Sequence, residues 1–129
     1  LKYALTFPER FYAAASFSGV VAMNLMDDLP PDEPFYTEME VLLGDPAGLK
    51  GSKHDPLFLL EQAAASGKPL PKLYISCGRQ DHPLYEGGLI FRDACASLNV
   101  PLTYHEEDGT HEWGLWDREL KKWLEMVLE

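Results

Sequence analysis

The chain has 129 residues, of which 46% are hydrophobic and 25% charged, and its formal net charge is −10. A chain of this length suits one domain that buries about two thirds of its unfolded surface. The acidic balance argues against nucleic-acid and anionic membrane partners, because both present negative charge. No stretch approaches the roughly 18 apolar residues that a bilayer span requires. We therefore expect a globular domain without nucleic-acid or membrane partners.

The start of the chain and its cysteines bear on its compartment. The chain begins with Leu1 instead of Met, and its first ten residues lack the apolar core and cleavage site of a signal peptide. This start is also compatible with a leader that has been removed. Cys77 and Cys95 are too few for a disulfide framework and fall in a predicted strand and helix. A reduced, cytoplasmic setting is the expectation.

The first segments predict the end of a helix and then a strand. Residues 1–6 carry apolar side chains at helical spacing without a preceding N-cap, and Pro8 ends the pattern. We interpret them as the last turns of a helix that begins before Leu1. Residues 11–18 form a nearly continuous apolar run rich in alanine, closed by Gly19. Small side chains suit a strand that helices cover on both faces.

Residues 20–69 predict an insertion that lies over one edge of the sheet as a cap-like region. Residues 27–34 are acidic and proline-rich and predict a loop, whereas residues 37–43 predict a short helix. Asp55 followed by Pro56 is a strong helix start, with Asp as N-cap and Pro at the first helical position. The apolar stripe of that helix is expected to consist of Leu57, Leu60 and Ala64.

The remaining segments alternate between strand and helix. We expect strands at 73–77 and 100–105, a helix at 83–98 and a closing helix at about 112–128. This order is typical of an α/β fold with about three parallel strands and flanking helices. The expected buried faces are Ile90, Phe91, Ala94, Cys95 and Leu98 in the first helix, and Trp113, Trp116, Leu120, Leu124 and Val127 in the second.

Asp81 and His111 are the main candidates for chemistry. Each follows a predicted strand, and one strand–helix–strand crossover separates them. The carboxyl ends of parallel strands meet at one edge of a sheet, so the two side chains are expected within hydrogen-bonding reach. A carboxylate beside a histidine fixes the tautomer of the ring and stabilises its cation during catalysis. The alternatives are that both residues only cap or pack locally, and that Asp108 is the acid.

Other candidates have simpler interpretations. His54, His82 and His105 are expected at the surface, in a loop and half-buried in the sheet, and the four histidines show no metal-ligand spacing. Residues 106–108 are expected to be a solvated turn. Trp113 is a candidate substrate contact because it follows His111 closely, although core packing explains it as well. Cys77 is expected to be a buried structural thiol and not a nucleophile.

Two motifs carry a resemblance to a known family. Residues 77–81 (Cys-Gly-Arg-Gln-Asp) and 109–116 (Gly-Thr-His-Glu-Trp-Gly-Leu-Trp) resemble the acid and histidine segments of α/β-hydrolase esterases. The most similar group is the esterase D family, with tributyrin-type carboxylesterases, S-formylglutathione hydrolases and related acetyl and feruloyl esterases. Residues 1–19 resemble the segment that follows the nucleophile elbow in that family. The match is vague only over about residues 20–67.

The resemblance implies roles and a missing part. It makes Asp81 the acid and His111 the general base of a Ser-Asp-His triad, with no metal or organic cofactor. No Gly-x-Ser-x-Gly occurs in the 129 residues, so the serine and the oxyanion hole are expected upstream of Leu1. The chain then resembles the C-terminal half of a single α/β-hydrolase domain, inactive alone. Ser16 and Ser18 are expected on the strand after the elbow helix and do not replace the nucleophile.

A chain of this kind would act on small carboxylic esters together with a partner. We expect the missing N-terminal half, or another copy, to pair along the strand edge of residues 11–18, because an open apolar edge promotes aggregation. Two alternatives remain. The chain acts only as a non-catalytic association module, or the parent enzyme is a peptidase or thioesterase of the same fold.

Overall fold

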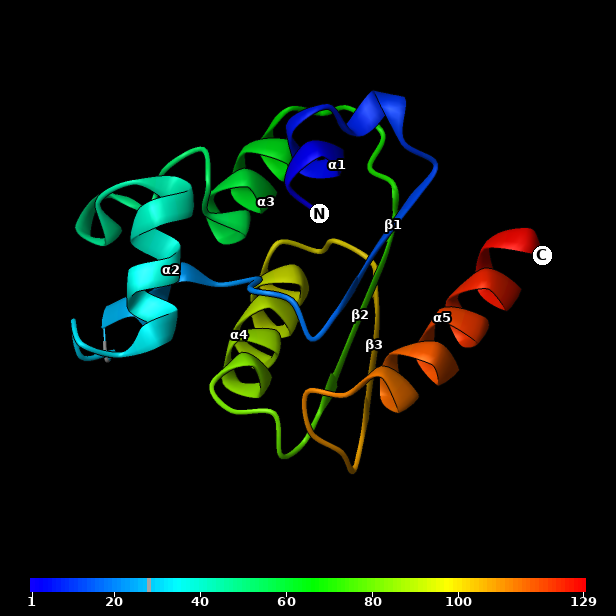
Figure 1. Ribbon diagram of the computed structural model, residues 1–129. Coiled ribbons are helices and arrows are strands. Elements are labelled where there is room, and N and C mark those ends of the chain that lie inside the picture. Colours follow the sequence, from blue (N-terminus) through cyan, green and yellow to red (C-terminus); the bar gives the residue numbers. More distant parts are fainter. Residues whose placement is uncertain (28) are drawn as a thin grey trace.

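Three strands form one parallel sheet in the order β1–β2–β3 in the computed structural model, which describes residues 1–27 and 29–129 (Figure 1). The strands are β1 (Ala13–Phe17), β2 (Lys72–Gly78) and β3 (Leu102–Glu107). The predicted α/β fold is confirmed, with all three strands in parallel register. β3 lies two residues further along the chain than predicted. Proline has no N–H to donate to a ladder, which explains why Pro101 precedes the strand.

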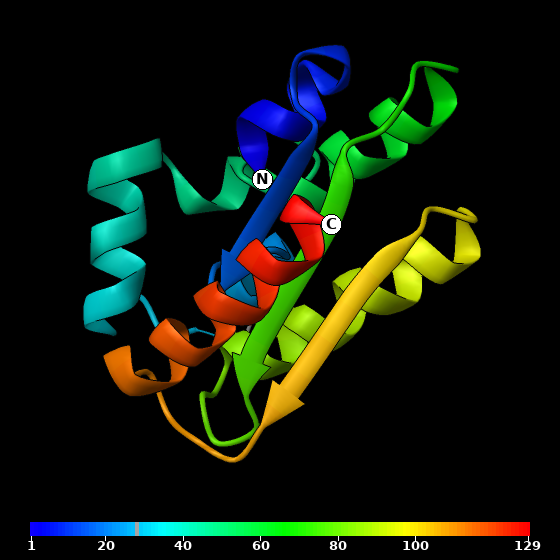
Figure 2. The same ribbon diagram turned by 90° about the vertical axis from the view of Figure 1, so that its right-hand side faces the viewer.

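Helices cover both faces of this sheet. The helices are α1 (Lys2–Thr6), α3 (Pro56–Ala65), α4 (Leu84–Ser97) and α5 (Trp113–Leu128). Figures 1 and 2 show α5 alone on one face, whereas α4 lies on the other face beside α1 and α3. Side chains of β2 alternate between the two layers: Leu73 and Ile75 join the core with α4, and Tyr74 faces α5. That main core also contains Leu5, Leu59, Leu60, Phe91, Cys95 and Val100.

The predicted faces of α3 and α4 are only partly correct. In α3, Leu60 is buried as expected, but its buried neighbours are Leu59 and Ala63. In α4, Phe91 and Cys95 are buried, whereas Ile90 and Leu98 are each 36% exposed. Two glycines complete the buried side of α4, and a Cβ on Gly87 would lie 3.8 Å from the Ala22 side chain. Gly87 therefore faces the insertion, whereas a Cβ on Gly88 would lie 3.6 Å from Tyr104 of β3.

The predicted face of α5 is only partly correct, because Trp116 and Val127 are half-buried, whereas the other three predicted residues are exposed. Trp113 is 80% exposed, and Leu120 and Leu124 are 40% and 41% exposed. The buried residues of α5 are Leu115 and Glu119, and the Glu119 carboxylate accepts a hydrogen bond from Tyr74 of the sheet at 2.7 Å. A hydrophobic pattern cannot reveal a face whose central residue is a charged side chain with buried partners.

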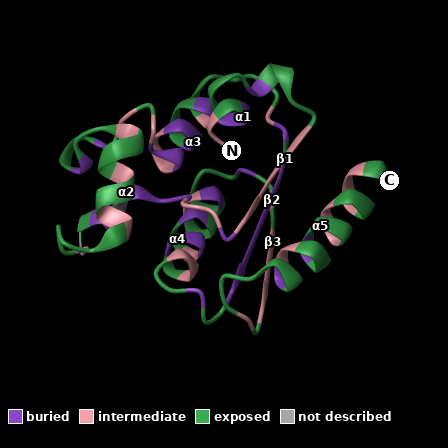
Figure 3. Cartoon of the chain, in the orientation of Figure 1, coloured by how far each residue is buried: buried purple, intermediate pink, exposed green. Residues whose placement is uncertain are grey.

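The insertion forms a small second core beside the sheet. It contains two 3₁₀ turns, η2 (Met23–Asp27) and η3 (Pro46–Gly48), and the helix α2 (Pro34–Leu43). The loop predicted at 27–34 is therefore shorter, because Pro34 occupies the first turn of α2 and Asp27 ends η2; Asp28 lies outside the described residues. Figure 3 shows that α2 carries no buried residue. The buried residues of this second core are Met23, Leu25, Met26 and Leu49.

Asp55 is the N-cap of α3, as predicted. Its carboxylate accepts hydrogen bonds from the backbone N–H groups of Leu57 (3.0 Å) and Gly51 (2.9 Å), and the residue is 4% exposed. We expect Asp55→Ala to lower the free energy of unfolding by about 2 kcal/mol, since a buried cap with two donors lies at the upper end of capping effects. Urea unfolding measures this change. Asp45→Ala, at the exposed cap of η3, is the matched control and should cost clearly less; equal losses would contradict the prediction.

No helix among residues 1–27 and 29–129 combines the length and the hydrophobicity that crossing a bilayer requires.

Candidate active site

The candidate acid, Asp81, lies directly after β2. Asp81 is 5% exposed, and its backbone N–H donates to the carbonyl of Gly78 at 3.0 Å, which closes a tight turn. The carbonyl of Asp81 accepts from Tyr85 at 2.8 Å as α4 begins. The residue is thus held between the strand and the helix that follows, with its side chain at the carboxyl edge of the sheet.

The histidine lies in the loop after β3, at the same edge. His111 Nδ1 is 2.9 Å from Asp81 Oδ2, and the His111 side chain is 55% exposed. The structure therefore brings together the two residues that the strand order places side by side. With Nδ1 held by the carboxylate, Nε2 is the nitrogen that remains for proton exchange with a reacting group.

The rival acid has a different partner. Asp108 Oδ1 accepts from Arg79 Nη1 at 3.1 Å, and the Asp108 side chain is 82% exposed. The hydrogen bond from Arg79 is the main cause that holds the pKa of Asp108 below its ordinary value. The turn predicted at 106–108 is partly wrong, because Glu106 and Glu107 end β3 and bond Arg79 and Arg118. Geometry thus pairs Asp81, and not Asp108, with the histidine.

Two tryptophans of α5 extend from the histidine. The Trp116 ring lies edge-on to His111, with a centroid distance of 4.6 Å, and Trp113 lies 5.1 Å from Trp116. Trp113, the predicted substrate contact, thus packs against Trp116, and Trp116 packs against His111. From the sequence, core packing was the favoured role of both tryptophans and Trp113 the better pocket candidate, yet Trp116 is the ring that lies beside His111.

A cleft of about 320 Å³ opens beside the pair. His82, expected only as a loop residue, lines it and also bonds Glu86. Phe35 and Glu33 come from the insertion, and sequence reasoning did not predict them, because their place depends on how the insertion packs. The full lining is Glu33, Phe35, Asp81, His82, Pro83, Leu84 and His111.

No described serine or cysteine is hydrogen-bonded to His111. Cys77 is 2% exposed, and burial raises the pKa of its thiol to about 11, so it stays protonated and inert near neutral pH. Ser16 lies in β1, as predicted, and Ser18 follows it with 4% exposure. The site therefore contains a carboxylate paired with an imidazole, and no described serine or cysteine is placed as a nucleophile beside them.

The remaining histidines have other partners. His105 is half-buried in β3, as predicted, and its Nδ1 lies 2.8 Å from Glu119. His54 is half-buried and lies 2.9 Å from Lys2 Nζ. Over residues 1–27 and 29–129, no group of three or more potential ligands is placed to hold a metal ion.

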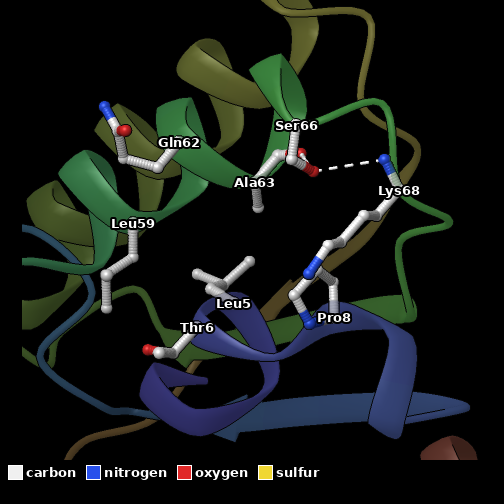
Figure 4. Close-up of a pocket in the computed structure, with 8 residues that line it drawn as sticks. All are labelled: Leu5, Thr6, Pro8, Leu59, Gln62, Ala63, Ser66 and Lys68. Carbon is white, nitrogen blue, oxygen red and sulfur yellow. Dashed lines mark hydrogen bonds between the residues drawn. The ribbon is translucent and has the colours of Figure 1, made fainter.

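A second hollow lies at the opposite end of the sheet, where the chain enters the strands. Figure 4 shows this groove of about 210 Å³ between α1 and α3, with Leu5 and Ala63 pointing into it. Lys68 borders it and reaches the exposed Glu9 at 3.2 Å. The groove contains neither member of the acid–base pair and belongs to the packing of two helices.

No family model matches the chain, but several known proteins are similar to it. An acetyl esterase from Caldicellulosiruptor saccharolyticus is 23% identical over 134 residues, which cover 98% of this chain and 50% of that protein. The S-formylglutathione hydrolase FrmB of Staphylococcus aureus is 36% identical, with a TM-score of 0.80 over 99% of this chain and 49% of its own. The fluorophosphonate-binding serine hydrolase FphF of the same organism, solved with substrate bound, is 34% identical with a TM-score of 0.81.

The fold and the similarity to these solved structures show an α/β-hydrolase fold. Within this class the chain is related to S-formylglutathione hydrolases and esterase D-type serine hydrolases and matches their C-terminal part, which confirms the resemblance seen in the sequence. The chain spans about half the length of these relatives.

Proposed function

We propose that the chain supplies the acid and the general base of a serine-dependent hydrolase of small carboxylic esters. The observation that carries this proposal is the 2.9 Å contact between His111 Nδ1 and the buried Asp81 carboxylate at the carboxyl edge of the sheet. The names of the relatives, which are esterases and hydrolases, support ester bonds as the target. The small cleft beside the pair, with apolar walls from Phe35 and Leu84, suits a short acyl group.

In this mechanism His111 moves a proton in both half-reactions. Nε2 accepts the proton of an attacking serine hydroxyl and then delivers it to the alcohol oxygen of the ester as that group leaves. Asp81 holds Nδ1–H and stabilises the imidazolium that forms in between. Water repeats the sequence on the acyl-serine and releases the acid. The serine and the oxyanion-hole donors come from a segment outside these 129 residues, so the chain alone is expected to be inactive.

The edge of β1 is the proposed place for that segment. β1 lies at the border of the described sheet and pairs with β2 only on its inner side. An edge strand offers a row of free backbone donors and acceptors that a further strand can pair with. A complementary half fits this edge better than a second copy does, because it brings the nucleophile to the side of His111.

A chimera tests the proposed function. The N-terminal part of the S. aureus S-formylglutathione hydrolase, which this chain does not match, is joined to residues 1–129. We expect the chimera to hydrolyse p-nitrophenyl acetate and to bind a fluorophosphonate probe covalently, and the isolated chain to do neither. Turnover by the isolated chain that His111→Ala abolishes would overturn the split of roles. A folded chimera without esterase activity that instead cleaves thioesters or peptides would move the proposal to those substrates.

A further inference from the structure

Gln80 links the loop of the acid to the loop of the histidine. Its side-chain Oε1 accepts a hydrogen bond from the backbone N–H of Gly109 at 2.7 Å. Its own backbone N–H donates to the carbonyl of Gly109 at 3.1 Å. One residue thus satisfies both backbone groups of Gly109. Gln80 is the neighbour of Asp81, and Gly109 precedes His111 by two residues, so the two bonds lie beside the catalytic pair.

The two loops also meet without any side chain between them. A Cβ on Gly78 would lie 2.2 Å from the carbonyl oxygen of Gly109, a distance that real contacts do not reach. A Cβ on Gly109 would lie 2.7 Å from Leu115 Cδ1, and Leu115 is fully buried at the start of α5. The histidine loop is therefore enclosed between the acid loop and α5, and only glycine fits at either contact.

The charged contacts around this point contribute less. Arg79 bonds Glu106 and Asp108, each at 3.1 Å, but its side chain is 43% exposed and that of Asp108 82%. Exposed ion pairs of this kind add little to stability, because water screens them. The two bonds between Gln80 and the Gly109 backbone therefore connect the loops more firmly than the ion pairs do, and the Gln80 Nε2 contact with the exposed Asp108 Oδ1 is long, at 3.5 Å.

We propose that Gln80 is a positioning residue that holds His111 against Asp81 by fixing Gly109; this inference rests on the proposed function. His111 is more than half exposed, so its own packing does not fix its place. Its contacts are the Asp81 carboxylate and the edge of Trp116, and both demand that the loop stay in one position. Removal of the Gln80 amide leaves the Gly109 N–H without its side-chain acceptor and frees the loop to move away from the acid.

The first experiment measures the tautomer of the His111 ring. In the ¹⁵N-labelled chain above neutral pH, long-range ¹H–¹⁵N spectra report which ring nitrogen of His111 carries the proton. We expect the Nδ1–H tautomer in the wild type and a mixture of tautomers in Gln80→Ala. Gln80→Glu keeps an oxygen for the Gly109 N–H but places a second carboxylate beside Asp108, so it is combined with Asp108→Asn; the pair of changes should recover most of the Nδ1–H signal. Gln62→Ala, an exposed glutamine of α3, is the matched control and should leave the spectrum unchanged.

Activity of the chimera gives a second readout. Gln80→Ala should lower kcat by about 10–100-fold with little change in KM, since small misplacements of a catalytic group have effects of this size. An unchanged His111 tautomer and kcat in Gln80→Ala would overturn the inference and leave the proposed function intact. A wild-type chain whose His111 shows no Nδ1–H tautomer would overturn both, because the acid–base pair itself would then be absent.

Discussion

Glu119→Ala is expected to lower the free energy of unfolding by about 3 kcal/mol, because the change leaves buried partners unpaired. Glu119 is fully buried between α5 and the sheet, and its carboxylate accepts from Tyr74 Oη and Lys122 Nζ, each at 2.7 Å. Alanine leaves a cavity and a Tyr74 hydroxyl, itself in a residue 3% exposed, without an acceptor. The loss stays below that of a fully enclosed ion pair, because the Lys122 and His105 side chains are 41% and 39% exposed.

Glu119 also makes the free energy of unfolding depend on pH. Burial alone would raise the pKa of Glu119, but hydrogen bonds from Lys122 and Tyr74 and the charge of His105 outweigh it and lower the pKa below its ordinary 4.5. A carboxyl with a lowered pKa in the folded state stabilises the fold above its unfolded pKa. That contribution is lost as the pH falls through the folded pKa.

Urea unfolding between pH 7 and pH 3 measures both effects. The wild type should lose stability as the pH falls below about 4.5, and Glu119→Gln, which cannot ionise, should show a shallower decline. Glu125→Ala, an exposed glutamate of the same helix, serves as control and should change the unfolding free energy by no more than about 0.5 kcal/mol. Equal effects of Glu119→Ala and Glu125→Ala would contradict the structural role of the buried carboxylate.

The predictions that the structure supports depend on local sequence preferences and on the order of the strands along the chain. Asp55 with Pro56 can begin a helix in almost any context, and two strands joined by one crossover place Asp81 and His111 at the same edge. The face of α5 could not be predicted, because Glu119 is buried through partners that lie 14 and 45 residues away. The position of Phe35 in the wall of the cleft could not be predicted either, since a sequence pattern does not show how an insertion packs against the rest of the fold.

In the chimera, Asp81→Asn should lower kcat by about 10⁴-fold and His111→Ala by about 10⁶-fold. Without the imidazole no group takes the proton of the serine. With asparagine at position 81 the ring remains, but the carboxylate that favours the Nδ1–H tautomer is lost, so Nε2 carries the proton and cannot act as a base. Both residues lie in one hydrogen-bonded pair, at 2.9 Å, and serve the same proton transfer.

Their effects should therefore not add. The double variant should be about as slow as His111→Ala alone, because the acid has nothing to orient once the imidazole is gone. Asp108→Asn separates the rival acid: its carboxylate bonds Arg79 at the surface, so kcat should fall by less than about tenfold. Steady-state kinetics with p-nitrophenyl acetate and labelling with a fluorophosphonate probe measure the activity of each variant. An equal loss of kcat in Asp108→Asn and Asp81→Asn would mean that Asp81 is not the acid. If the losses at positions 81 and 111 instead multiply in the double variant, the two residues do not act as a pair.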